Sequence, residues 1–360
     1  MTVHSANSKQ GFTLMELVVA MALGLLVMGA MTSLFKTGLD STRLIMQRTE
    51  TQQNMRAAID LMVKDISMAG AGLPSGGLQL PTGAGATASN FACDQSGTCH
   101  VPNFNYPNNN YMYGIIPGFR NGVENDAVVP SAPSPAINDS ITVIYADYNF
   151  PLSEYDVTFT SGSGNHMVIT PDPAFNPPPP PVMSPGGIQV GDLILLQNTC
   201  GAAVGEVTNL NATDIAFTDS DPLQMNQNGA ASNNIKAISG ANCGTTSANR
   251  LFAVTYYLTV PPTNAQRPRL MRQVNGLPPV PVADDIINLQ FAYDVYNSNN
   301  AALDANQANP IGAGDSLNLI QKINVVVMGQ SITNFGNKSQ NMYLATSVSA
   351  RNMAFRNRYQ

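Results

Sequence analysis

Charged residues are scarce in this sequence, and tryptophan is absent. Of the 360 residues, 11% are charged, less than half of the roughly 25% that is usual in soluble domains. The 17 basic residues are outnumbered by 23 acidic ones, so the chain lacks the positive charge with which proteins bind nucleic acid. We therefore expect no nucleic-acid partner. The hydrophobic content of 44% excludes a chain that is disordered throughout.

Motifs for catalysis are also missing. The sequence contains no H-E-x-x-H, G-x-x-x-x-G-K-[ST] or G-x-S-x-G pattern. Its three histidines, His4, His100 and His166, are far apart in the chain. We therefore predict that the protein is not an enzyme and holds no cofactor. An enzyme anchored by a single helix is the alternative.

One long apolar run is present near the N-terminus, over residues 12–35. As a helix, its roughly two dozen residues can cross the ~30 Å hydrocarbon core of a bilayer. A small residue, Gly11, stands before the run, whereas a secretory signal peptide has its small-residue cleavage site after the run. We therefore predict a leader over residues 1–11 that is removed on the cytoplasmic side, and a transmembrane helix over 12–35 that remains.

Glu16 is the only charged residue in that run. A lone carboxylate in hydrocarbon costs on the order of 2.5–3.5 kcal/mol on insertion scales. Such a residue is expected to be functional and to have a partner.

The segment GFTLME (residues 11–16), followed by the apolar run, resembles the class III signal of type IV prepilins and type II secretion pseudopilins. The resemblance implies that a prepilin peptidase cleaves between Gly11 and Phe12 and that Phe12 is N-methylated. It also implies that Glu16 pairs with the new amino group of a neighbouring subunit's Phe12, which would set the register of a filament core because an unpaired buried charge is costly. An ordinary signal anchor with an incidental glutamate is the alternative.

Residues 36–69 predict an amphipathic continuation of this helix. A mostly apolar stripe recurs there at helical spacing, formed by Ile45, Gln52, Met55, Ile59, Met62, Ile66 and Ala69. The opposite face is charged and carries Arg43, Arg48, Glu50, Arg56, Asp60 and Lys64. Gly70, Gly72 and Pro74 then end the pattern. The stripe predicts where a globular body packs on the helix.

Residues 70–360 predict a β-rich body. Residues 70–138 are rich in glycine, proline and asparagine and predict long loops. Short strand-like runs follow at Ile141–Ala146, Tyr155–Phe159, Met167–Thr170, Asp192–Gln197, Asp214–Thr218, Phe252–Val260, Arg269–Val274, Ile286–Tyr296, Ile323–Met328 and Met342–Ser349. The turn residues that separate these runs favour antiparallel sheets. A polyproline stretch at 176–181 is read as an extended spacer, and a division of the body into two lobes near 176–187 is considered. A ligand for a proline-binding module is the alternative reading of that stretch.

Three body segments extend the resemblance. RAAIDLMVKDISMAGAG (56–72), VGDLILLQ (190–197) and DDIINLQFAYDVY (284–296), with a last strand ending near residues 351–352, resemble PilW-type minor pilins. The J-type minor pseudopilin of type II secretion has similar segments but is usually shorter. The resemblance implies a pilin-like α+β fold, in which a long N-terminal helix packs on a mainly antiparallel β-sheet body with long loops.

Four cysteines, Cys93, Cys99, Cys200 and Cys243, fall in the part expected to be exported, where disulfides form. Four cysteines allow three connectivities, among which the sequence does not decide. Our prediction is neighbour pairing, 93–99 and 200–243. Zinc at Cys93-x5-Cys99-His100 is disfavoured because the spacing is not that of a zinc finger.

Two acidic and asparagine-containing loops are weaker candidates, for calcium. They contain Asp219, Asp221, Asn226 and Asn228 in one case, and Asp304, Asn306 and Asp315 in the other. Neither has the full EF-hand pattern, and solvated turns are the commoner outcome. We therefore predict no metal site. The C-terminal Arg351, Arg356 and Arg358 are expected to face solvent or another subunit.

From the resemblance we expect a minor pilin, a structural subunit of type IV pilus assembly located at or near the pilus tip. It would lie in the inner membrane with its body in the periplasm, and later in the pilus at the cell surface. Its partners would be the major pilin, other minor pilins, prepilin peptidase and the inner-membrane assembly platform. A type II secretion pseudopilin, and a pilus-associated adhesin or DNA-uptake subunit, are the alternatives.

Overall fold

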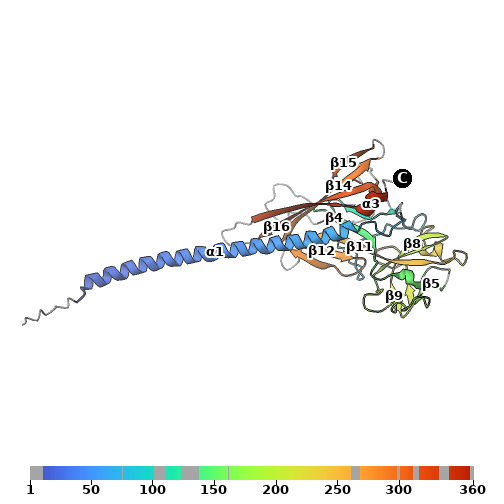
Figure 1. Ribbon diagram of the computed structural model, residues 1–360, viewed down its shortest axis with the longest axis horizontal. Helices are drawn as coiled ribbons and strands as arrows, with labels where there is room; N and C mark the ends of the chain where they lie inside the picture. Colours follow the sequence, from blue (N-terminus) through green and yellow to red (C-terminus); the bar gives the residue numbers. More distant parts are fainter. Residues whose placement is uncertain are drawn as a thin grey trace, which may run out of the picture. The chain divides into compact units, whose positions relative to one another are not determined.

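The computed structural model describes residues 11–74, 76–100, 111–122, 138–160, 162–260, 268–297, 301–310, 316–331 and 340–356. A long helix, α1 (Leu14–Ser67), is followed by antiparallel sheets (Figure 1). This arrangement confirms the α+β fold predicted from the sequence. The chain divides into two units, residues 1–50 with 331–340 and residues 51–330 with 341–360.

The first unit contains the apolar part of α1. The helix includes an 18-residue window of mean hydropathy 2.2, so by length and composition it can cross a membrane. The large apolar side chains of this part are exposed, for example Met28 at 70%. Apolar exposure on this scale marks a surface that is covered by lipid or by other helices.

The second unit is built on a seven-stranded sheet. Its main path runs β13 (Val280–Asp284), β12 (Arg269–Val274), β11 (Ser247–Thr259), β4 (Ser140–Ala146) and β3 (Ile115–Gly118). Strand β7 (Leu193–Asn198) also pairs with β11, and β8 (Gly201–Glu206) pairs with β7. These pairings are all antiparallel, as the frequent turn residues led us to expect.

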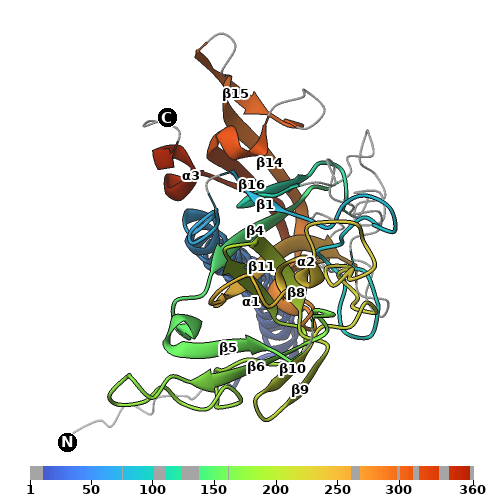
Figure 2. The same cartoon turned by 90° about the vertical axis from the view of Figure 1, so that its right-hand side faces the viewer.

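Two four-stranded sheets lie at opposite ends of this unit (Figure 2). One has the order β15 (Ala302–Gln307), β14 (Ile286–Asn297), β16 (Ile320–Ser331) and β17 (Gln340–Ser349). The other has the order β5 (Tyr155–Phe159), β6 (His166–Pro171), β10 (Asp214–Ala216) and β9 (Asn209–Asn211). Shorter elements are β1 (Leu78–Gln79), β2 (Tyr111–Met112), η2 (Leu152–Glu154), α2 (Ile235–Ile238), η3 (Leu317–Leu319) and α3 (Arg351–Arg356).

The prediction of loops throughout 70–138 is wrong at β3. Residues Ile115–Gly118 form a buried strand that pairs with β4, although Pro117 lies within it. Proline is tolerated there because β3 is at the edge of the sheet, where one side of the strand needs no N–H donor.

Residues 51–67 of α1 pack on the sheets of the second unit. The predicted stripe is buried at Met55, Ile59, Met62 and Ile66, whereas Gln52 is exposed, as is Ile45 in the first unit. The helix ends two residues earlier than predicted, and Gly70 adopts the left-handed conformation (φ 77°) that glycine accepts without strain.

Asp65 is buried within this packed half of α1. Its carboxylate accepts hydrogen bonds from the hydroxyls of Tyr145 (2.8 Å) and Tyr256 (2.6 Å) and from Nε of Arg272 (2.9 Å). Burial and the negative charge of Asp65 raise the pKa of both tyrosines. The helix is therefore joined to β4, β11 and β12 by a charged network as well as by apolar contacts.

The second unit has two hydrophobic clusters. The larger one joins α1 to the seven-stranded sheet and to the sheet that contains β14 and β16. The smaller one lies between the sheet that contains β5 and β6 and the strands β7 and β8. Val182, directly after the polyproline stretch at 176–181, belongs to this smaller cluster, whose other members come from both sides of that stretch. The division into lobes near 176–187 stays a prediction.

Candidate functional site

Residues 11–16 form the start of α1 and contain the predicted processing and assembly residues. Gly11 and Phe12 precede the helix, and the Phe12 side chain is 90% exposed. An added Cβ at Gly11 would meet nothing within 4 Å. The peptide bond between Gly11 and Phe12 is therefore outside regular structure and accessible, as the substrate of a peptidase must be.

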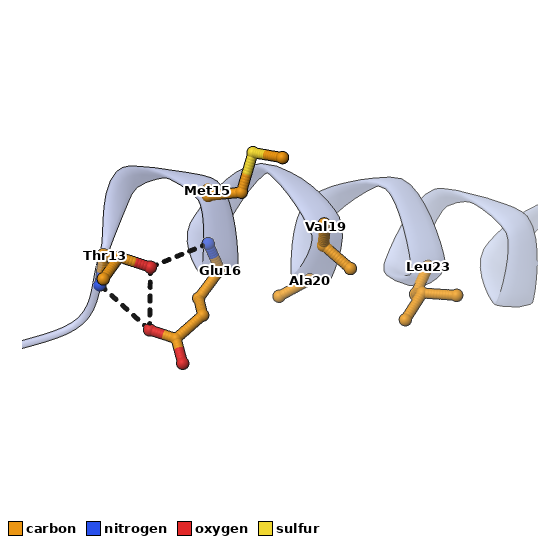
Figure 3. A pocket seen from close by; sticks show the side chains of 6 residues that line it. All are labelled: Thr13, Met15, Glu16, Val19, Ala20 and Leu23. Carbon is orange, nitrogen blue, oxygen red and sulfur yellow. Dashed lines mark hydrogen bonds between the residues drawn. The ribbon is translucent and has the colours of Figure 1, made fainter.

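Glu16 folds back on the first turn of the helix (Figure 3). Its Oε2 accepts hydrogen bonds from the backbone N–H of Thr13 (2.9 Å) and from the Thr13 hydroxyl (3.0 Å). In return, the N–H of Glu16 donates to Oγ1 of Thr13 (3.3 Å). This reciprocal pattern is a capping box, which satisfies backbone donors that a helix start leaves unpaired.

The sequence interpretation missed the role of Thr13. Its signal was present, because Thr13-Leu14-Met15-Glu16 has the T-x-x-E spacing of a capping box. The sequence predicts a role for Glu16 through its charge, and the structure gives it a second, local role in starting the helix. Its assembly role, like cleavage at Gly11 and methylation of Phe12, stays a prediction.

The surroundings of Glu16 are otherwise apolar. A shallow hollow on the helix surface is lined by Thr13, Met15, Glu16, Val19, Ala20 and Leu23 (Figure 3). Within the described residues, Glu16 has hydrogen bonds to Thr13 but no ion pair with a cation. The carboxylate therefore lies on the exposed surface of the first helical turn.

The four cysteines are joined as neighbours. Cys93 is bonded to Cys99 and Cys200 to Cys243, which is the pairing predicted from the sequence. The thiols that a zinc site would need are therefore oxidised. In the part of the chain that the structure describes, no three His, Cys, Asp or Glu side chains come together as a metal site would require.

The first calcium candidate is a hydrogen-bonded loop. Oδ1 of Asp219 accepts from the backbone N–H (2.9 Å) and the side-chain amide (2.8 Å) of Asn228. Asp221 accepts from the backbone N–H groups of Met225 (2.6 Å) and Asn226 (3.1 Å). These carboxylate oxygens face N–H donors, which stabilise the loop as a turn.

The second candidate is not assembled among the described residues. Asp304 accepts a hydrogen bond from Asn297 (2.9 Å), and Asn306 bonds to Asn324 (2.7 Å). Asp315 lies outside the described residues.

The remaining predicted polar residues are dispersed. His100 contacts Asp94 (2.9 Å) and His166 contacts Asp214 (3.4 Å), while His4 lies outside the described residues. At the C-terminus, Arg351 is exposed at the start of α3, Arg356 ends that helix, and Arg358 is not among the described residues.

Sequence comparison connects the first residues of the chain to a known motif. The family named Prokaryotic N-terminal methylation motif matches residues 6–32, which include Gly11, Phe12 and Glu16. No match was found among curated proteins or among solved structures. The motif supports a type IV pilin or pseudopilin, and thus a membrane-anchored structural subunit rather than an enzyme. It implies other pilus subunits and a prepilin peptidase as partners.

Proposed function

We propose that this protein is a minor pilin, a PilW-like structural subunit of type IV pilus assembly that acts at or near the pilus tip. The observation that carries the proposal is the methylation motif at the start of an exposed apolar helix whose other half is built into a large β-rich body. The second unit comprises residues 51–330 with 341–360 and has two hydrophobic clusters, so the body is large. Bulk is least obstructive at the tip, where no subunit has to pack above it.

The proposed assembly step depends on residues 11–16. Cleavage after Gly11 would give Phe12 a free amino group, which has a reference pKa near 8 and is cationic at neutral pH. In a filament, the amino group of one subunit would reach Glu16 of a neighbour and form a charge-assisted hydrogen bond. The capping box supports this step because it holds the carboxylate at the surface of the first turn.

Processing is tested by intact mass measurement on the protein isolated from its native membrane. We expect the loss of residues 1–11 and the gain of one methyl group on Phe12. A chain that retains its leader in cells with an active prepilin peptidase would contradict the processing step.

Assembly is tested with Glu16→Gln, and Glu50→Gln provides a matched control because Glu50 is an exposed acid on the same helix. Losing one partner of a buried ion pair costs on the order of 3–5 kcal/mol, more than about a hundredfold in an equilibrium constant. We expect Glu16→Gln to insert in the membrane but to disappear from sheared pili, while Glu50→Gln enters them normally. Equal incorporation of both variants would remove the charge-pair argument.

A further inference from the structure

Two carboxyl groups lie side by side in the interior of the second unit. Glu206 ends β8 and Asp221 lies in the loop after β10, and both residues are fully buried. One short segment binds both carboxyl groups, because Oε2 of Glu206 accepts from the N–H of Leu223 (3.1 Å) while Asp221 accepts from the N–H groups of Met225 (2.6 Å) and Asn226 (3.1 Å). The two side chains are thereby brought close enough to interact. Two carboxylates in contact away from water cannot both be ionised without a large cost, so the pair shares one proton.

The surrounding donors indicate which group is the anion. Asp221 accepts two backbone hydrogen bonds, from the N–H groups of Met225 (2.6 Å) and Asn226 (3.1 Å). Such bonds favour the ionised form of a carboxyl group. Burial and the charge of Asp221 raise the pKa of Glu206 well above its ordinary value. Burial raises the pKa of Asp221 as well. Glu206 accepts one backbone hydrogen bond, from Leu223 (3.1 Å), and one from the side-chain amide of Gln95, whereas Asp221 accepts two from the backbone. The arrangement thus favours Asp221 as the carboxylate and Glu206 as the neutral acid that donates to it.

Glu206 also connects three separate segments. The side-chain amide of Gln95 donates to Oε1 of Glu206 from within the disulfide loop, residues 93–99. The N–H of Leu223 donates to Oε2 (3.1 Å) from the 217–228 loop. Gly276, in the turn between β12 and β13, packs so closely that a Cβ there would overlap Oε1.

The backbone at Glu206 is held by the same loop. The side chain of Asn226 accepts from the N–H of Glu206 (2.8 Å) and donates to its carbonyl oxygen (2.7 Å). The 217–228 loop is therefore hydrogen-bonded to Glu206, the last residue of β8, at both the backbone and the side-chain carboxyl group of Glu206. A change in the charge of Glu206 acts directly on this junction.

The other ionisable groups on the elements around the pair have different partners. Asp94 of the disulfide loop contacts His100 at 2.9 Å. Asp192, before β7, lies 3.5 Å from Arg250 of β11. Asp219 accepts from Asn228, as described above. Since these groups interact with other partners, it is the proton on Glu206 that prevents the two carboxyl groups of the pair from both being negatively charged.

We propose that Glu206 and Asp221 form a pH-sensitive latch. One proton held between them fastens the disulfide loop and the 217–228 loop to the end of β8. Loss of that proton at alkaline pH places two charges in contact and loosens both loops. The latch responds to the pH of the solution around the protein, and the proposal does not depend on the proposed pilus role.

The direction of the pH effect follows from linkage. The folded chain holds a proton on Glu206 at pH values where the unfolded chain, with a pKa of 4.5, has released it. The stabilisation is therefore fully present below pH 4.5 and declines as the pH rises through neutrality toward the folded-state pKa. Each pH unit in this range weakens the folded state by up to about tenfold in the folding equilibrium constant.

Glu206→Gln tests the latch because glutamine keeps the shape and can still donate to Asp221, but it does not titrate. Asp156→Asn is the matched control, since Asp156 is exposed on β5. With the full chain in detergent, we expect the melting temperature of Glu206→Gln to exceed that of the unmodified protein by a margin that grows between pH 5 and pH 9. Asp156→Asn should follow the unmodified protein. Parallel curves for all three proteins would overturn the proposal.

Two measurements separate the latch from a general change in stability. Amide hydrogen exchange, corrected for its intrinsic pH dependence, should lose protection in the disulfide loop and the 217–228 loop as the pH rises, and Glu206→Gln should retain it. Infrared spectra of the unmodified protein should show a carboxylic-acid C=O band at neutral pH that Glu206→Gln lacks. Absence of this band from the unmodified protein would overturn the proposal even if the variant failed to fold.

Discussion

One acidic residue in each half of α1, Glu16 and Asp65, shows how differently the two halves of the helix are surrounded. Glu16, in the apolar half, is on the helix surface, and its hydrogen bonds come from Thr13, three residues away. Asp65, in the packed half, is buried, and its partners come from positions far away in the chain. A carboxylate whose hydrogen bonds come from the same helical turn stabilises that turn, whereas a carboxylate with distant partners fixes the tertiary fold. The difference separates the proposed assembly residue from a structural residue on the same helix.

Asp65→Ala should produce the largest loss of stability. The change removes the carboxylate that accepts from the hydroxyls of Tyr145 and Tyr256 and from Nε of Arg272, which also donates to the Tyr256 hydroxyl (3.2 Å). Breaking a buried charged network by removing one partner costs on the order of 3–5 kcal/mol. Urea unfolding of the full chain, followed by tyrosine fluorescence because the sequence has no tryptophan, measures the loss.

Asp65→Asn sharpens this test because it keeps an acceptor oxygen but removes the charge. Its loss of stability should be smaller than that of Asp65→Ala. If the free energy of unfolding falls by about 3–5 kcal/mol in Asp65→Ala but stays close to that of the unmodified protein in Asp65→Asn, hydrogen bonding dominates over charge in this network. Unchanged stability in both variants would contradict the structural role given to Asp65.

A second comparison uses two methionines of the same helix. Met62 is fully buried against the sheets, whereas Met28 is 70% exposed. Met62→Ala should cost about 2–5 kcal/mol, because it removes buried surface and leaves a cavity. Met28→Ala should leave the unfolding midpoint of the body unchanged and should instead weaken retention in the membrane or filament. If Met28→Ala and Met62→Ala lowered the unfolding midpoint equally, the two halves of α1 would not differ in how they stabilise the body.

The same contrast explains what could be predicted from the sequence. Local patterns correctly predicted the helix over the apolar run, the burial of the stripe from Met55 to Ile66, and strands such as β5 and β12, whose bounds match the prediction. These features depend on residues close together in the chain, so periodicity and turn residues reveal them.

Features built from distant residues could not be predicted in the same way. Asp65 was not singled out, although it lies beside the stripe, because Tyr145, Tyr256 and Arg272 become its neighbours only after folding. Glu206 was missed for the same reason. Strand β8, with the sequence GAAVGE, has weak strand propensity, and its pairing with β7 determines its structure.

Thr13→Ala should have the smallest effect, and it tests whether the capping box matters to the site. Replacing a threonine N-cap by alanine costs about 1 kcal/mol of helix stability. The loss is confined to the first turn, where the N–H of Glu16 would lose the Thr13 hydroxyl as its acceptor and Oε2 would lose one of its two donors. Faster amide exchange at residues 14–16 in detergent should report it.

Thr13→Ser restores the hydroxyl and is the matched control for that measurement. If the capping box positions Glu16 for a neighbouring amino group, Thr13→Ala should reduce incorporation into pili by up to about fivefold, the equivalent of 1 kcal/mol. Thr13→Ser should recover it. A Thr13→Ala variant with faster exchange but full incorporation would show that the cap serves only the helix and that Glu16 finds its partner without being held in place.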